Sequence, residues 1–353
     1  MKKYFKNKKV LITGHTGFKG SWLCLWMNFL GADVMGCSYG KRTNPSNFDI
    51  LKLKKKIKSK KIDIRNFKSI NKSIQNFKPN FIFHLAAEAI VKRSYQFPKK
   101  TWETNTLGTV NILESLRNYK KKITVVIITS DKVYKNKETR KGYKENDELG
   151  NFDPYSASKS SADIATQSYI KSFLINKKNI KIAIARAGNV IGGGDWAENR
   201  LIPDCIRSWK KNKTVVIRNP KSTRPWQHVL DILNGYISLA VELNKNKKIN
   251  GEAFNFGPKI EKKNDVINVV KSMRLHWKNA KWRVNKTVGF FESKLLYLNS
   301  SKSRSFLKWK CYLNLKKSIF FTIAWYKIYI ENPKKIHNFS INQIKKFSEL
   351  LGN

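Results

Sequence analysis

Short apolar runs alternate with longer amphipathic segments over the first half of the chain. The run Ile123–Thr129 is continuous and rich in β-branched residues, which is typical of a strand buried on both faces. This pattern predicts strands at Lys9–Thr13, Asp33–Ser38, Lys61–Ile64, Phe81–Leu85, Ile123–Thr129 and Ile180–Arg186. It predicts helices at Lys19–Leu30, Phe67–Phe77, Thr101–Tyr119 and Tyr155–Phe173. Strands that alternate with helices predict an α/β fold with a doubly wound parallel sheet.

The alternation becomes irregular after Gly188, where loops surround residues 192–196 and Arg218–Arg224. Phe254–Phe256 is predicted to be a late strand that returns to the sheet. We therefore expect a first domain over residues 1–187, with a return segment at about 226–257. A smaller C-terminal substrate-binding domain is expected over residues 188–225 and 258–353, and the Lys-rich end from Pro333 is predicted to be a surface helix.

Composition indicates a globular protein with an unusual charge. The 353 residues are 41% hydrophobic, which allows one large or two ordinary domains and excludes a disordered chain. A net charge of +47 would suit a nucleic-acid partner. However, the lysines are spread in short groups beside Asn and Ile, which favours a general compositional drift. We expect no nucleic-acid partner, and the charge would instead attract an anionic substrate.

The cysteines and apolar runs indicate a protein of a reducing compartment. Cys24, Cys37, Cys205 and Cys311 lie far apart, with no CxxC motif and no His at ligand spacing. This argues against a metal site and a disulfide framework, and predicts a cytoplasmic protein. No apolar run approaches the roughly 18–20 residues of a membrane span, so no membrane association is expected.

The stretch Val10–Trp22 places a glycine-rich loop between the first strand and the first helix. Gly14, Gly17 and Gly20 are spaced three apart, a variant of the dinucleotide fingerprint. Glycines permit a tight turn, and the helix N-terminus offers free N–H groups to a pyrophosphate. The loop therefore predicts a Rossmann-type dinucleotide site.

The segment after the second strand bears on which dinucleotide this site prefers. An acidic residue there would bind the ribose hydroxyls of NAD, but Ser38–Arg42 contains none. Arg42 would meet the 2′-phosphate of NADP, or it is a solvated surface residue. Asp63, after the third strand, is better placed for the adenine end.

Tyr155 and Lys159 form a YxxxK motif at the start of a predicted helix. One turn separates them, so both side chains lie on one face, where the Lys ammonium would lower the pKa of the phenol. Asp153 and Pro154 equally mark an ordinary helix start. Ser130 follows the buried strand Ile123–Thr129, at the sheet edge where ligands bind.

The glycine loop, His84–Ala87, Ser130 and the YxxxK motif occur in one order at regular intervals. Together they resemble the extended short-chain dehydrogenase/reductase family over essentially the whole chain. Longer segments are similar to the nucleotide-sugar 4,6-dehydratases that act on CDP-glucose: Gly14–Leu23, Thr129–Tyr134, Arg186–Asp204 and Arg218–Val229. Such enzymes remove the C6 hydroxyl of an NDP-hexose as water and leave a 4-keto-6-deoxy sugar for surface polysaccharides.

The resemblance implies a role for each site residue. Tyr155 is the base at the C4 hydroxyl, Lys159 tunes it, and Ser130 orients the C4 oxygen. Asp131 fits the acid at C6, and either Lys132 or a water is the base at C5. The cofactor implied is NAD, with NADP left open, and its expected contacts are Gly14, Thr16, Gly17, Phe18, Lys19, Asp63, Ile64, Leu85, Ala86, Ala87, Tyr155 and Lys159.

The expected substrate contacts are Asn189, Arg200, Arg218, Arg224 and His228. We expect Trp226 to be a core residue rather than a substrate contact. We expect His84 to be a hydrogen-bonded histidine at the end of its strand rather than a catalytic residue. Glu88 stands where the resemblance leads us to expect Gln; its carboxylate would be exposed and harmless, or would disturb substrate binding.

Three further questions stay open at the level of sequence. The resemblance implies a homodimer through Thr101–Tyr119 and Tyr155–Phe173, although their apolar faces would equally serve to pack on the sheet. An alternative enzyme is a C4-epimerase or a dehydratase of another nucleotide sugar, such as dTDP-glucose or GDP-mannose. A Rossmann-like scaffold that binds nucleic acid through its charge is the non-enzyme alternative.

Overall fold

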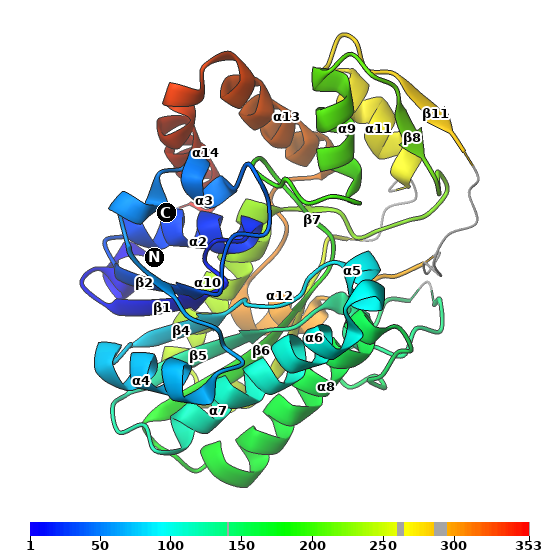
Figure 1. Ribbon diagram of the computed structural model, residues 1–353. Helices are drawn as coiled ribbons and strands as arrows, with labels where there is room; N and C mark the ends of the chain where they lie inside the picture. The colour runs from blue at the N-terminus through cyan, green and yellow to red at the C-terminus, as the bar shows by residue number, and fades with distance from the viewer. Residues whose placement is uncertain (140, 260–264, 286–294, 353) are drawn as a thin grey trace.

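The computed structural model describes residues 1–139, 141–259, 265–285 and 295–352. Its centre is a seven-stranded parallel sheet, which confirms the predicted doubly wound α/β fold (Figure 1). The strands lie in the order β10 (Ala253–Phe256), β6 (Ile180–Ala187), β5 (Ile123–Ile128), β4 (Phe81–His84), β1 (Lys9–Thr13), β2 (Asp33–Ser38) and β3 (Lys58–Lys61). The predicted late strand therefore does return to the sheet, as its edge strand β10 beside β6.

Two hydrophobic cores cover the two faces of this sheet. Successive strand residues point to opposite faces, so Leu11 joins one core while Val10 and Ile12 join the other. The core that contains Leu11 packs against α4 (Phe67–Phe77), α7 (Gly108–Arg117) and α8 (Pro154–Tyr169). The core that contains Val10 and Ile12 packs against α2 (Phe18–Phe29) and α10 (Val229–Lys245), on the other side of the sheet in Figure 1.

The two long helices predicted in the middle of the chain are confirmed, each with a π-helical turn. The turn Glu103–Leu107 joins α6 (Pro98–Trp102) to α7, and the turn Ile170–Leu174 extends α8. Asp153 caps α8 by accepting the backbone N–H of Ser156, and Pro154 occupies the first turn, where its missing N–H costs nothing.

The third strand was predicted at Lys61–Ile64 but lies at Lys58–Lys61. It pairs with β2 along one side and is the far edge of the sheet, so its lysines are largely exposed. An edge strand held by main-chain bonds carries no apolar alternation. The apolar signal came instead from Ile64, which is buried against Gly108 after the strand has ended.

A second group of elements, at the top of Figure 1, follows β6 in the chain. It contains α9 (Leu201–Lys210), β8 (Val215–Ile217), α11 (Val266–Arg274), β11 (Trp282–Val284) and α13 (Leu315–Glu331). Small parallel pairings join β8 to β11 and β7 (Val190–Ile191) to β9 (Gln227–His228). The remaining short helices are α1 (Lys2–Phe5), α3 (Asn47–Ile50), α5 (Val91–Gln96) and α12 (Ser301–Leu307). Across the described ranges, no helix has both the length and the apolar character that crossing a bilayer requires.

The C-terminal helix α14 (Ile336–Leu350) is a surface helix, as predicted, since Lys345 and Lys346 are exposed, but it also has a buried inner face. Ile336, Ile344 and Phe347 on its inner face are buried, and the helix contacts both α2 and α13. The ring of Phe347 meets Trp26 of α2 edge-on, with centroids 5.8 Å apart. The end of the chain thus covers the outer side of the helix that follows the glycine loop.

We expect Phe347→Ala to lower the free energy of unfolding by about 3 kcal/mol, because it leaves a cavity in this contact. Urea unfolding followed by circular dichroism measures the loss. Leu350→Ala, whose side chain lies on the same helix and is 44% exposed, is the matched control and should change stability little. Equal midpoints for both variants would show that α14 adds nothing to the core.

Candidate active site

The glycine loop has the shape of a dinucleotide cradle. Gly14 has a φ of +73°, and a side chain there would place its Cβ 2.8 Å from the backbone of Ala86. A Cβ on Gly20 would lie 2.2 Å from the carbonyl oxygen of Gly14. Gly17 is the N-cap residue of α2 and has no side chain to cap the helix, so the first N–H groups of the helix are open to an anion. These residues fit a bound pyrophosphate.

Hydrogen bonds connect this loop to the end of β4. The hydroxyl of Thr13 is 2.8 Å from His84 Nδ1 and accepts the backbone N–H of Ala86. The other ring nitrogen of His84 is 3.1 Å from Thr109 Oγ1, and burial lowers the pKa of His84 to about 3. His84 is therefore the satisfied structural histidine that was expected. Leu85, Ala86 and Ala87 follow it along the cradle.

At the predicted adenine end, the charged residues are paired with one another. Arg42 forms an ion pair with Glu88, so it is neither a free cation nor a purely solvated residue. Asp63 binds Arg65 at 2.6 Å, and this hydrogen bond holds the pKa of Asp63 below its usual value. Of the two alternatives left open for Glu88, the exposed one is wrong, because that residue is only 5% exposed. Ile64, a predicted cofactor contact, turns its side chain into the core.

The end of β5 and the start of α8 bring three predicted catalytic residues together. The hydroxyl of Tyr155 donates to Ser130 Oγ at 3.3 Å, and Ser130 Oγ donates to Asp131 Oδ1 at 3.0 Å. All three residues are buried. A continuous hydrogen-bonded path therefore runs from the phenol to the carboxyl group.

Asp131 has the environment of a proton donor. Its Oδ2 is buried and has no hydrogen-bond partner within the described part of the chain. Burial raises the pKa of Asp131, although Lys132, Arg224 and Lys19 oppose the shift. Gly188 leaves room for this carboxyl, because a Cβ there would come within 2.6 Å of Oδ2.

The pKa values of Tyr155 and Lys159 correct one prediction. Burial raises the pKa of Tyr155 to about 12, whereas proximity to Lys159 was expected to lower it. Burial also lowers the pKa of Lys159 to about 7, so at neutral pH its positive charge is partly lost. Its ammonium donates to the backbone carbonyl of Ile128 at 3.1 Å rather than to the phenol. Desolvation outweighs the charge effect on which the prediction relied.

Lys19 and Tyr236 extend this centre. Lys19 was expected to contact the cofactor, but it lies within electrostatic reach of Asp131 and 5.9 Å from the ring centroid of Tyr236. Burial lowers the pKa of Lys19 to about 8. The hydroxyl of Tyr236 is buried without a hydrogen-bond partner among the described residues. Sequence analysis missed Tyr236, because it occupies an ordinary apolar position of α10.

The predicted substrate residues lie at different depths. Arg200 forms a 2.8 Å ion pair with Asp195 and is a third exposed, and Arg224 is buried close enough to Asp131 to affect its pKa. Asn189 is half-buried between β6 and β7 and accepts the backbone N–H of Gln227. Arg218 is exposed, whereas His228 is fully buried and caps α10. Trp226 is buried, in agreement with the core alternative.

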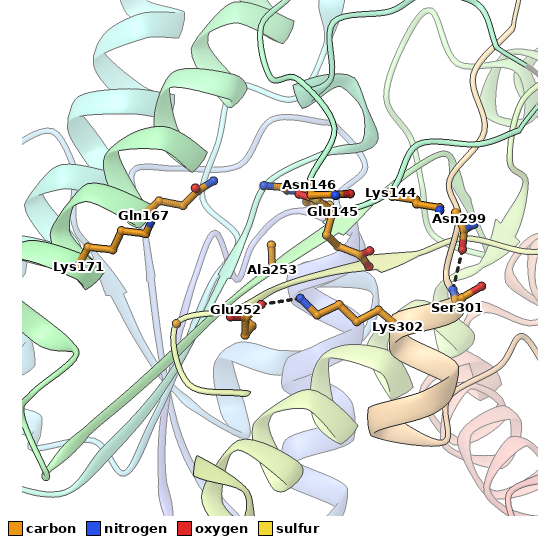
Figure 2. Close-up of a pocket in the computed structure, with 12 residues that line it drawn as sticks. Lys144, Glu145, Asn146, Gln167, Lys171, Glu252, Ala253, Asn299, Ser301 and Lys302 are labelled. Atoms are coloured by element: carbon orange, nitrogen blue, oxygen red, sulfur yellow. Dashed lines mark hydrogen bonds and ion pairs between the residues drawn. The ribbon is translucent and has the colours of Figure 1, made fainter. Parts of the chain in front are cut away.

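A cavity of about 600 Å³ at the β10 edge contains none of the predicted site residues (Figure 2). Glu145 points into it and accepts the backbone N–H of Asn255 on β10. Across the cavity, Lys302 binds Glu252 at 2.6 Å. The carboxylate of Glu145 thus binds a main-chain N–H of the edge strand β10 that could otherwise pair with another chain. We therefore regard the cavity as structural. Within the described ranges, no cluster of His, Cys, Asp or Glu has the arrangement of a metal site.

The lowered pKa of Lys159 predicts a pH-dependent stability. An unfolded Lys keeps its ordinary pKa of 10.5, so between about pH 7 and 10.5 the unfolded chain binds more protons than the folded one, and stability rises with pH. Replacement by a neutral side chain should thus raise the urea midpoint of ligand-free protein most at about pH 6, and less at about pH 9. Lys159→Met tests this, with the exposed Lys171→Met as control. An equal effect of Lys159→Met at both pH values would contradict the buried cation.

Comparison with known proteins identifies the family to which the chain belongs. The family model described as GDP-mannose 4,6 dehydratase matches residues 11–319. The CDP-glucose 4,6-dehydratase of Salmonella typhimurium is 42% identical over 93% of both chains. Two solved structures share the fold: UDP-glucuronic acid 4-epimerase of Bacillus cereus (TM-score 0.76, 24% identity, 90% of this chain and 99% of that one) and dTDP-glucose 4,6-dehydratase of Bacillus anthracis (0.73, 22%, 91% and 96%). The chain belongs to the GDP-mannose 4,6 dehydratase family.

Proposed function

We propose that this protein is a CDP-glucose 4,6-dehydratase, a hydro-lyase that converts CDP-glucose to CDP-4-keto-6-deoxyglucose and water. One observation carries the dehydration: the buried Asp131 carboxyl, with one oxygen unpartnered in the described chain, next to the Tyr155–Ser130 pair. The choice of CDP-glucose rests on the Salmonella relative, which matches 93% of this chain. The product would serve the synthesis of deoxysugars for surface polysaccharides such as O-antigen.

The cofactor that we propose is NAD. The two fold relatives named above were solved in complexes with NAD, and the cradle of Gly14, Gly17 and Gly20 suits a pyrophosphate. When bound in this cradle, NAD would supply hydride chemistry: a hydride would be accepted from C4 of the sugar and returned at C6, so the reaction involves no net oxidation. Lys159, one turn after Tyr155 on α8, would hold its nicotinamide ribose.

Oxidation at C4 needs a base for the hydroxyl proton. Tyr155 is the proposed base, and Ser130, within hydrogen-bond reach of its phenol, orients the C4 oxygen. Since the pKa of Tyr155 is raised to about 12 in the ligand-free site, a positive charge must approach the phenol before it ionises. Lys159 lies one turn away on the same helix, and Arg200 already lowers the pKa of Tyr155 against the effect of burial.

The C4 ketone acidifies the C5 proton and prepares the elimination. Asp131 would donate its proton to the C6 hydroxyl, which leaves as water, while Lys132 or a water molecule takes the proton from C5. Burial raises the pKa of Asp131 and so favours the protonated form that this step requires. An epimerase needs no acid at C6, and the buried carboxyl therefore argues for dehydration.

Substrate binding would use the positive charges around this centre. Arg224 and Lys19 both lie near Asp131, and Arg200 affects the pKa of both Lys19 and Tyr155. Arginine suits bidentate binding of a diphosphate. Asn189 and His228 remain proposed contacts, and the exposed Arg218 would act from the rim.

We further propose a cytoplasmic homodimer without a nucleic-acid partner. Leu107, Ile164 and Phe173 belong to the two long helices and are 55%, 53% and 45% exposed, which supports an interface on this outer face. All four cysteines are free thiols, and three of them are buried, which supports a reducing compartment.

Incubation with NAD and each nucleotide sugar, followed by mass spectrometry, tests the proposal. We expect loss of one water from CDP-glucose, and a rate lower by about 10³-fold in Tyr155→Phe, because the base is lost without a change of volume. Turnover of dTDP-glucose or GDP-mannose but not CDP-glucose would overturn the choice of nucleotide. Conversion to CDP-galactose, an isomer of unchanged mass that NMR of the product detects, would instead identify an epimerase.

A further inference from the structure

The ion pair between Arg42 and Glu88 crosses the cofactor cradle. Arg42 lies in the turn after β2, and Glu88 in the loop after β4. In the sheet, β1 lies between these two strands. A bond between their following loops therefore passes over the end of β1, where the glycine loop begins.

Glu88 is the fixed partner in this pair. Its side chain is only 6% exposed, whereas that of Arg42 is 42% exposed. Asn105 anchors the main chain of Glu88 by accepting its N–H at 2.8 Å and donating to its carbonyl oxygen at 3.2 Å. The same amide donates to Ser158 at 2.9 Å, so the main chain of Glu88 is tied to α8. Arg93 lies 4.0 Å from its other oxygen.

The rest of the turn after β2 offers no alternative selector for the adenosine ribose. Lys41, the other cation in the turn, binds Asp49 at 2.8 Å. The carbonyl oxygen of Gly40 accepts a hydrogen bond from Thr16 of the glycine loop at 2.7 Å, which places this turn beside the cradle. The segment Ser38–Arg42 contains no acidic residue that could bind a 2′-hydroxyl. Discrimination at this position must therefore depend on whether Arg42 is available.

We infer that Glu88 is a specificity-determining residue that withholds Arg42 from a 2′-phosphate, so that the site prefers a dinucleotide with a free 2′-hydroxyl. To bind a 2′-phosphate, Arg42 would have to leave Glu88, and a buried carboxylate would lose a positive partner beside the incoming negative group. A dinucleotide with a free 2′-hydroxyl can bind while the Arg42–Glu88 ion pair stays intact. This inference rests on the proposed function, because it assumes a dinucleotide in the cradle.

Binding of NADH and NADPH, measured by isothermal titration calorimetry, tests the inference without any turnover. In Glu88→Gln, which keeps the shape of the side chain and frees Arg42, the Kd for NADPH should fall at least about 10-fold relative to that for NADH, since a charge-assisted hydrogen bond to phosphate is gained. Adding Arg42→Ala to this variant should abolish the gain. Glu148→Gln removes the same charge at an exposed ion pair with Lys135 and should leave the ratio unchanged.

Two results would overturn the inference: an unchanged Kd ratio in folded Glu88→Gln, or a gain that survives the added Arg42→Ala. Arg42→Ala in the parent gives a second test that does not depend on the Glu88 variant. It should alter both Kd values by less than about twofold, since an arginine engaged by Glu88 contributes to neither ligand. A selective loss of NADPH binding would contradict the inference. If the parent binds neither dinucleotide, the proposed function itself fails, which is a separate outcome.

Discussion

Burial of ionisable groups at the carboxyl end of β5 and the start of α8 sets the chemistry that this site can perform. Ser130, Asp131, Tyr155 and Lys159 are all shielded from water, and desolvation is the largest influence on the pKa of the last three. It favours a neutral carboxyl, a neutral phenol and a partly neutral amine. A carboxyl held toward its neutral form suits the proton donor that we propose Asp131 to be, whereas the phenol of Tyr155 stays neutral until a positive charge approaches it.

The surrounding fold keeps these groups at fixed distances. The close approach of Gly14 to Ala86 and of Gly188 to Asp131 allows backbone segments to meet where a side chain would separate them. Behind the site, Arg186 forms a fully buried pair with Asp163, and Asp163 also accepts from Thr129, the residue before Ser130. The end of β5 is thus connected to both α8 and β6. Loss of either partner would leave a buried charge, so these contacts stabilise the catalytic geometry.

Local patterns allowed much of the fold and the grouping of the main site residues to be predicted. Continuous apolar runs predict the buried strands. The glycine loop and the YxxxK motif can be identified because their residues have fixed spacings. The position of β3 was not predicted, because an exposed edge strand of Lys and Ser has no apolar signal. The positions of Lys19 and Tyr236 beside Asp131, and the Arg42–Glu88 pair, depend on elements far apart in the chain. The raised pKa of Tyr155 depends on burial, which spacing alone does not reveal.

In the proposed reaction, Asp131 supplies the proton at C6, separately from the oxidation that begins at Tyr155. The most direct measurement follows Asp131→Asn with CDP-glucose in D₂O, by NMR of the recovered sugar. Loss of water should slow by about 10²–10⁴-fold while deuterium still enters C5, because only the elimination lacks its acid. Dehydration at the parental rate, or an equal loss of deuterium exchange and dehydration, would contradict the claim.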